Sequence, residues 1–110
     1  MRVQFKRLTE AAFLVMVVDL AELHGWLVMH QRPAWTKRGW RTAVTGSPGF
    51  PDLILIRDGV MLAVELKADG GRLTPEQDRW LEAFRRCGIG GGIWRPKDWD
   101  LIELTLRREP

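Results

Sequence analysis

One segment, residues 53–67, restricts the fold of this chain more than any other. Two apolar, β-prone stretches at residues 53–56 and 60–64 flank Asp58-Gly59, a dipeptide that favours a two-residue turn with positive φ at both positions. The segment therefore predicts a β-hairpin. Because apolar side chains alternate onto both faces of its strands, we expect the hairpin to lie inside a layered domain.

The hairpin brings three charged side chains together. Counting outward from the turn sets Asp52 opposite Glu65, and opposed residues have Cβ atoms roughly 4.5–5.5 Å apart on one face. Lys67 follows Glu65 by two residues, so it lies on the same face. Opposed carboxylates repel each other, but a divalent ion such as Mg²⁺ reverses that effect. The cluster predicts a metal site for phosphodiester hydrolysis, where the ion and the lysine neutralise developing charge.

The same residues also have a plain structural interpretation. Pro-Asp pairs and Glu-x-Lys triplets occur by chance, and an acid beside a lysine is most often a solvated surface pair. Here the turn, the register and the shared face agree, and the strands that end at these charges are apolar on both sides. The metal site is therefore the favoured interpretation.

The rest of the chain predicts a single α/β domain spanning residues 1–110, with a mixed sheet and helices on both sides. Thr9 caps a first helix that Gly25 ends, and the nearly continuous apolar surface of this helix predicts that it is buried. Thr74, Pro75 and Gln77 begin a second helix with a capping box. The expected order is α-β-β-β-α-β-α, with elements at residues 10–24, 26–29, 53–67 (two strands), 75–87, 93–94 and 96–106, and a loop at residues 30–50.

The segment at residues 96–106 fits two patterns. Trp99, Ile102 and Leu106 have helical spacing, whereas Ile102, Leu104 and Leu106 also alternate as they would in a strand. The helix is the favoured interpretation of this segment.

The expected loop at residues 30–50 contains a candidate nucleic-acid-binding surface. Basic residues alternate there with tryptophans: Arg32, Trp35, Lys37, Arg38, Trp40 and Arg41. Basic side chains contact phosphates, and an exposed tryptophan can stack on an unpaired base. An ordinary solvated loop whose tryptophans are buried in the core or in a subunit interface explains these residues equally well. Arg72 is a second candidate phosphate contact, and recognition of DNA shape is favoured over recognition of sequence.

Cysteine usage and hydropathy exclude other classes of protein. The single cysteine, Cys87, cannot form an internal disulfide and suits a reducing compartment. No stretch approaches the roughly 18 apolar residues of a membrane span, and no signal-peptide pattern is present. We therefore expect a cytosolic protein without membrane contact.

Three motifs together resemble a known family. They read GSPGFPD at residues 46–52, ELK at residues 65–67 and GRLTPEQ at residues 71–77. This combination closely resembles the virus-type replication-repair nuclease (VRR-NUC) family, a branch of the PD-(D/E)xK superfamily. The resemblance extends from the first helix to the strand at residues 93–94, and it implies a restriction-endonuclease-like core.

The resemblance also implies an activity and a set of site residues. It implies a DNA nuclease that depends on Mg²⁺ or Mn²⁺, and some stand-alone members from phages and bacteria act on branched DNA as dimers. Asp52 and Glu65 match the metal-binding acids of the family, and the carbonyl of Leu66 matches a further ligand. Lys67 matches the catalytic lysine.

Two further residues match the family but have structural explanations of their own. Glu10 matches an acid on the first helix near the metal, although the helix dipole alone favours an acid there. Gln77 matches a glutamine that begins the helix after the Glu-x-Lys strand, although the capping box alone explains it.

These expectations lead to competing functions. The leading one is a structure-specific, metal-dependent endonuclease that cuts branched DNA, a Holliday junction or a flap, in the cytosol of a bacterium or a phage-infected host. It would act as a homodimer, with Trp94, Trp99 and residues 96–106 as a candidate interface. The alternative is a non-catalytic nucleic-acid-binding or assembly module on a nuclease-like scaffold. A nuclease or toxin directed at RNA shares the chemistry and differs only in substrate.

Overall fold

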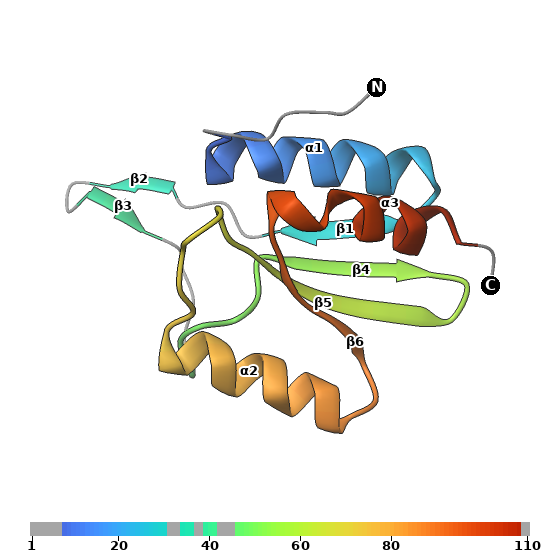
Figure 1. Ribbon diagram of the computed structural model, residues 1–110. Coiled ribbons are helices and arrows are strands. Elements are labelled where there is room, and N and C mark those ends of the chain that lie inside the picture. The colour runs from blue at the N-terminus through green and yellow to red at the C-terminus, as the bar shows by residue number, and fades with distance from the viewer. Residues whose placement is uncertain (1–7, 31–33, 37–38, 42–45, 109–110) are drawn as a thin grey trace.

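The computed structural model describes residues 8–30, 34–36, 39–41 and 46–108, with only the backbone described at residues 34–36 and 39–41 (Figure 1). The elements are α1 (Glu10–Leu23), β1 (Leu27–His30), β2 (Ala34–Thr36), β3 (Gly39–Arg41), β4 (Leu53–Arg57), β5 (Val60–Leu66), α2 (Pro75–Arg86), β6 (Gly90–Trp94), the 3-10 turn η1 (Pro96–Asp98) and α3 (Trp99–Arg107). None of the described helices combines the length and the apolar character of a membrane span.

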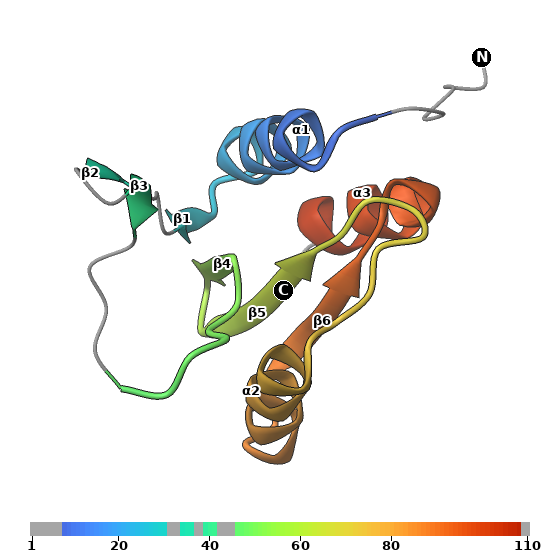
Figure 2. The same ribbon diagram turned by 90° about the vertical axis from the view of Figure 1, so that its left-hand side faces the viewer.

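A four-stranded mixed sheet forms the centre of the fold, in the order β1-β4-β5-β6. The pairs β1–β4 and β4–β5 are antiparallel, and β5–β6 is parallel. Helices α1 and α3 pack together on one face, while α2 covers β5 and β6 on the other (Figures 1 and 2). This arrangement confirms the predicted mixed sheet flanked by helices, in the predicted order of elements.

The predicted hairpin is confirmed in its turn and in its register. Asp58 has φ 51° and Gly59 has φ 79°, as the two central residues of a type I′ turn require. The pairing runs from Arg57 opposite Val60 to Leu53 opposite Val64. The turn chemistry therefore determines which residues oppose each other at the far end of the strands.

The main core lies between the sheet and the α1–α3 layer. Each inward side chain that it buries completely contributes roughly 1.5–3 kcal/mol to the free energy of unfolding. Its buried members are Phe13, Val17, Ala21, Trp26, Leu53, Leu55, Leu62, Val64, Leu66, Trp94, Ile102 and Leu106. The helix predicted at residues 96–106 is confirmed as α3, which buries Ile102 and Leu106 in this core.

Two expectations about burial are wrong. Helix α1 is buried on one face only, because the sheet and α3 cover that side; Val15 and Leu23 are 57% and 77% exposed. Trp94, a candidate for a subunit interface, is 7% exposed and belongs to the core. The large apolar side chains that α3 leaves exposed are instead Leu101 and Leu104.

The expected loop at residues 30–50 contains a small second sheet, which corrects the prediction. Strands β2 and β3 pair antiparallel, with Trp35 opposite Trp40. Glycine, proline and basic residues lower strand propensity, but backbone pairing across a short connection needs only three residues on each side. The composition therefore predicted a loop where the structure has two short strands.

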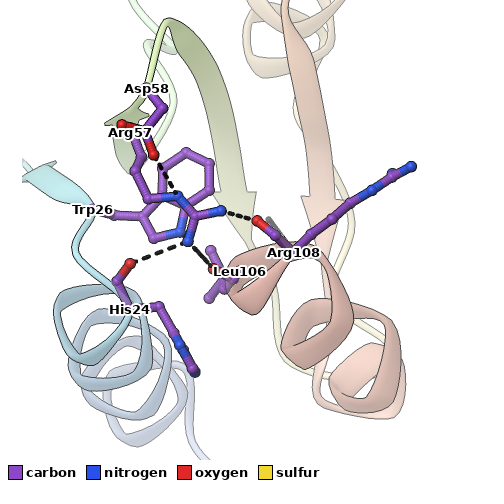
Figure 3. Close-up of polar contacts among 6 residues, drawn as sticks. All are labelled: His24, Trp26, Arg57, Asp58, Leu106 and Arg108. Carbon is purple, nitrogen blue, oxygen red and sulfur yellow. Dashed lines mark hydrogen bonds and ion pairs between the residues drawn. The ribbon is translucent and has the colours of Figure 1, made fainter. Parts of the chain in front are cut away.

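Arg57 joins the ends of two helices at the end of the sheet where the hairpin turns (Figure 3). Its guanidinium carbon lies 4.6 Å from the centre of the Trp26 ring. The guanidinium donates hydrogen bonds to the backbone carbonyls of His24 (3.1 Å), Leu106 (2.8 Å) and Arg108. The indole N–H of Trp26 donates to the Leu106 carbonyl as well, at 2.7 Å. These contacts satisfy carbonyl groups that the C-terminal ends of α1 and α3 leave unpaired.

Candidate active site

The hairpin register brings Asp52 and Glu65 together at the edge of the sheet opposite the turn. Asp52 directly precedes β4, and Glu65 is the penultimate residue of β5. Oδ2 of Asp52 accepts a hydrogen bond from the backbone N–H of Leu66, at 2.8 Å. Glu65 is 2% exposed, the most deeply buried charged residue in the described part of the chain. A carboxyl group at this depth needs a partner that offsets its desolvation.

The electrostatics of the pair follow from burial and proximity. Burial first, and then the hydrogen bond and the charge of the neighbouring Asp52 carboxyl, raise the pKa of Glu65 to about 8, while the charge of Lys67 opposes the rise. Oε2 of Glu65 is buried and, the neighbouring Asp52 carboxyl aside, has no hydrogen-bond partner among the described residues. An unpartnered buried acceptor beside a second carboxyl group fits a divalent cation, which is held through oxygen ligands.

Gln77 contacts Glu65 and caps α2 at the same time. Its Oε1 accepts the backbone N–H of Thr74 at 3.0 Å, and its own backbone N–H donates to Oγ1 of Thr74 at 3.1 Å. Its Nε2 remains free to donate to Oε1 of Glu65, at 3.3 Å. Gln77 therefore serves both as a helix cap and as a contact of Glu65, because Oε1 of its side-chain amide makes the first contact and Nε2 makes the second.

The loop that leads into Asp52 lies tightly against α2. Gly49 has φ 93°, and a Cβ added there would lie 2.6 Å from the backbone carbonyl carbon of Glu76. The indole N–H of Trp80 donates to the carbonyl of Pro48 at 2.9 Å, and the Phe50 ring meets the Trp80 ring edge-on at 5.0 Å. Helix α2 therefore supports both carboxyl groups, one through Gln77 and the other through this loop.

Sequence reasoning missed the part that Trp80 plays. Its helical spacing predicted only a packed residue on α2, and the available signal did not reveal which segment it contacts. The acceptors are carbonyls more than thirty residues earlier in the chain, at Ser47 and Pro48. Such a contact depends on how α2 packs against the loop and not on local pattern.

The other predicted site residues differ in their exposure and in their contacts. Lys67 is partly exposed directly after β5, and its backbone N–H donates to the Trp94 carbonyl at 3.1 Å. The side chain of Leu66 is buried in the core, so only its backbone can take part in the site. Glu10 is exposed in the first turn of α1, and its charge is the smallest contribution to the raised pKa of Glu65. Arg72 is exposed on the connection between β5 and α2.

A third metal-ligating side chain does not join the pair within the described residues. No group of three or more His, Cys, Asp or Glu side chains in that part of the chain is close enough to hold an ion. The structure therefore brings Asp52, Glu65 and Gln77 together, and the charge of Glu10 on α1 also acts on Glu65.

The candidate DNA-binding residues of the β2–β3 region are only partly within the described structure. Arg32, Lys37 and Arg38 lie outside the described residues. Trp35, Trp40 and Arg41 are on β2 and β3, where the backbone alone is described. Their contact with nucleic acid stays a prediction.

Comparison with known proteins gives two findings. The model of the VRR-NUC domain family matches residues 14–95. A solved structure described as a VRR_NUC domain protein has a TM-score of 0.65 and 23% sequence identity, over 91% of this chain and 87% of that chain. At this identity the structural likeness shows the fold alone. No curated protein matches the chain.

Proposed function

This chain belongs to the VRR-NUC domain family, and from that premise we propose that it is a nuclease that hydrolyses DNA with Mg²⁺ or Mn²⁺. The observation that carries the proposal is the buried pair of Asp52 and Glu65 beside Lys67, with an unpartnered oxygen on Glu65. An arrangement that costs stability in the metal-free protein is expected where function requires it.

Each residue of the site has a distinct part in this proposal. Asp52 and Glu65 hold the cation, with the carbonyl of Leu66 as a further ligand. When bound, the cation supplies Lewis-acid polarisation of the phosphoryl group. Lys67 stabilises the negative charge that develops on the phosphate oxygens. Gln77 fixes the orientation of the Glu65 carboxylate through the contact of its Nε2 with Oε1.

The substrate in this proposal is branched DNA, a Holliday junction or a flap, bound by a homodimer. A chain of 110 residues offers a small footprint, and two-fold symmetry would place two sites on one junction. The basic and aromatic residues of the β2–β3 region would contact the backbone and unpaired bases. Leu101 and Leu104, exposed on α3, are available for a subunit interface.

The test is cleavage of labelled single-stranded, duplex, flap and four-way-junction DNA, with Mg²⁺, Mn²⁺ or EDTA. We expect cutting with metal only, and complete loss of cutting in Asp52→Asn and Lys67→Ala proteins that remain folded. Asp19→Asn, which changes an exposed acid on α1, is the matched control and should cut normally. Cutting by either site variant at the parent rate would refute the proposal.

A second candidate is a nucleic-acid-binding module without catalysis. One observation favours it: among the described residues, only two acids share the site. This candidate predicts DNA binding that EDTA does not change and no cutting of any DNA in the panel. Replacement of the DNA with the corresponding RNA separates a nuclease directed at RNA from both.

A further inference from the structure

A recess of about 300 Å³ lies next to Lys67, at the end of the sheet where β5 and β6 finish. It is lined by Asp69, Gly70, Gly71, Arg95 and Lys97. Because β5 and β6 are parallel, with Leu66 opposite Trp94, the chain leaves both strands at the same edge. A Cβ added to Gly71 would lie 3.7 Å from Cβ and Cδ of Lys67, so Gly71 lines the recess on the side that faces the lysine.

Arg95 is held in the wall of this recess by two contacts. Its backbone N–H donates to Oδ2 of Asp98 at 3.0 Å, and its Nη1 donates to the carbonyl of Ala68 at 2.9 Å. A guanidinium has five N–H donors, and no other acceptor within the described ranges takes those that remain. Arg95 is therefore positioned and still able to bind a ligand.

The charges around the recess favour an anion. Lys97 is exposed and forms no ion pair with any residue that the structure describes. Asp69 is the one acid in the lining, and it does not pair with Arg95 or Lys97. The two positive charges of Arg95 and Lys97 therefore outweigh the single negative charge of Asp69. Gly70 and Gly71 have no side chain to obstruct a bulky ligand at the mouth of the recess.

We propose that this recess binds a backbone phosphate of the nucleic acid, one or two nucleotides from the phosphate that is cut. The inference rests on the nuclease function proposed above. Asp52 precedes β4, Glu65 and Lys67 are at the end of β5, and Arg95 follows β6, so the charged residues succeed one another along the edge of the sheet. Neighbouring strands are roughly 4.8 Å apart, which sets this second site one strand beyond the first.

The fork of Arg95 suits a phosphate, because a guanidinium donates two parallel hydrogen bonds to two oxygens of one group. The phosphate would be held on the β6 side of the carboxyl pair and not on the other side. A DNA strand would therefore not bind equally well in its two possible directions along this end of the sheet. The bound strand would therefore lie in one orientation relative to the carboxyl pair, and the cut would fall at a defined position from the anchored phosphate.

The test is a binding experiment in EDTA, which does not depend on catalysis. The probes are junction DNAs in which one phosphate at a time, at each position near the branch point, is replaced by an uncharged methylphosphonate. In the parent, one such position should weaken binding by roughly three- to tenfold. In Lys97→Ala and Arg95→Gln proteins, overall binding should fall by a similar factor, and that position should lose its effect.

Two controls make the result specific. Arg86→Ala removes an exposed cation from the last turn of α2, and it should leave the effect of every methylphosphonate unchanged. Lys97 is exposed and makes no described hydrogen bond, so its replacement should preserve folding even where loss of the Arg95 contact to Ala68 does not. The dependence of binding on salt should become shallower by about one unit in log–log slope for Lys97→Ala.

The outcomes separate this inference from the proposed function. Two results would overturn the phosphate site. One is that each methylphosphonate has the same effect on binding by the parent and by Lys97→Ala. The other is that the parent does not bind DNA. Such a result together with metal-dependent cutting would leave the nuclease assignment intact. Loss of one positional effect in a protein that never cuts DNA would support the phosphate site and refute the nuclease.

Discussion

Glu65 is a buried carboxyl group whose pKa is raised from 4.5 to about 8, chiefly by burial and then by Asp52. The folded protein therefore binds this proton more tightly than the unfolded chain does. The stability that this provides is fully present below about pH 4.5 and is lost as the pH rises through about 8. Between these values the unfolded chain has lost the proton that Glu65 keeps in the folded, metal-free protein, so the folded state becomes less stable as the pH rises.

We expect the melting temperature of the metal-free protein to fall between pH 5 and pH 8, and to fall less in Glu65→Gln, which is neutral at every pH. Thermal unfolding in EDTA across this range measures the effect. Asp100→Asn, at an exposed acid in the first turn of α3, should keep the slope of the parent. A slope that is equally steep in Glu65→Gln would contradict the assigned cause.

Gln77 allows its two contacts to be separated by substitution. Gln77→Glu keeps an acceptor for the capping box but removes the donor to Glu65, whereas Thr74→Ala removes the cap and leaves that donor in place. We expect Thr74→Ala to lower the free energy of unfolding by about 1 kcal/mol with near-normal cutting. We expect Gln77→Glu to cut at least tenfold more slowly, because another carboxylate, in addition to that of Asp52, would face Glu65. Equal rates in the two variants would show that Gln77 acts only as a cap.

For single residues, the sequence predicted the contacts that depend on local structure. The opposition of Asp52 and Glu65 follows from a two-residue turn whose geometry Asp58 and Gly59 impose. The hydrogen bond from Gln77 to Glu65 connects the hairpin to the next helix, and the capping pattern does not show where the free end of the amide points. Arg95 had no signal in the sequence, because its position beside Lys67 depends on parallel pairing between β5 and β6.

At the scale of elements, α2 is the support on which the site depends. Gly49 touches the backbone of this helix so closely that any side chain would push the loop, and Asp52 with it, away from Glu65. We expect Gly49→Ala to weaken Mn²⁺ binding and cutting by more than tenfold, beyond a loss of stability of about 1–3 kcal/mol. Isothermal titration with Mn²⁺ and cleavage assays on folded protein measure the two effects.

Gly88→Ala is the matched control for Gly49→Ala. Gly88 has φ 79°, so alanine there suffers the same kind of backbone strain, yet an added Cβ would have no neighbour within 4 Å. It should lower stability by about 1 kcal/mol and leave Mn²⁺ binding unchanged. If both variants lose Mn²⁺ binding equally, backbone strain and not the contact with α2 explains the effect.

Arg57 connects elements at the opposite end of the sheet from the carboxyl pair. Arg57→Lys keeps the charge but loses the fork that reaches His24, Leu106 and Arg108, so we expect a loss of about 1–3 kcal/mol in the free energy of unfolding. Chemical denaturation measures it, with the exposed Arg107→Lys as control. Cutting by the folded fraction should be unchanged, and a selective loss of cutting would show that this end of the sheet influences the site.

Prediction at the scale of elements succeeded where caps and turns mark the ends of a segment. Thr9 and Thr74 cap α1 and α2 as predicted, and Asp58-Gly59 forms the predicted turn. The β2–β3 pair was missed because three-residue strands carry too little periodicity to detect. The exposed outer face of α1 was missed because apolar content does not show how many sides of a helix its neighbours cover.

At the scale of the whole molecule, the exposed side chains of Leu101 and Leu104 suit association between two chains through α3. They are three residues apart and so share a helix face. We expect light scattering to give twice the mass of 12.7 kDa, and the double variant Leu101→Asp, Leu104→Asp to give the single-chain mass while staying folded. Val15→Asp, on the outer face of α1, is the control and should remain a dimer. A single-chain mass in the parent would exclude the dimer.

The hairpin turn also determines where a partner molecule can be attached without harm. An added Cβ at Gly59 would meet nothing within 4 Å, and β4 separates this tip from Asp52 by five residues, or roughly 17 Å. A tag coupled to a side chain at position 60, where the exposed Val60 adjoins the turn, leaves the two-residue turn intact and would tether the protein to a surface with its carboxyl pair pointing outward into solution. The tip of the hairpin is thus the natural anchoring point for single-molecule observation of this chain on DNA.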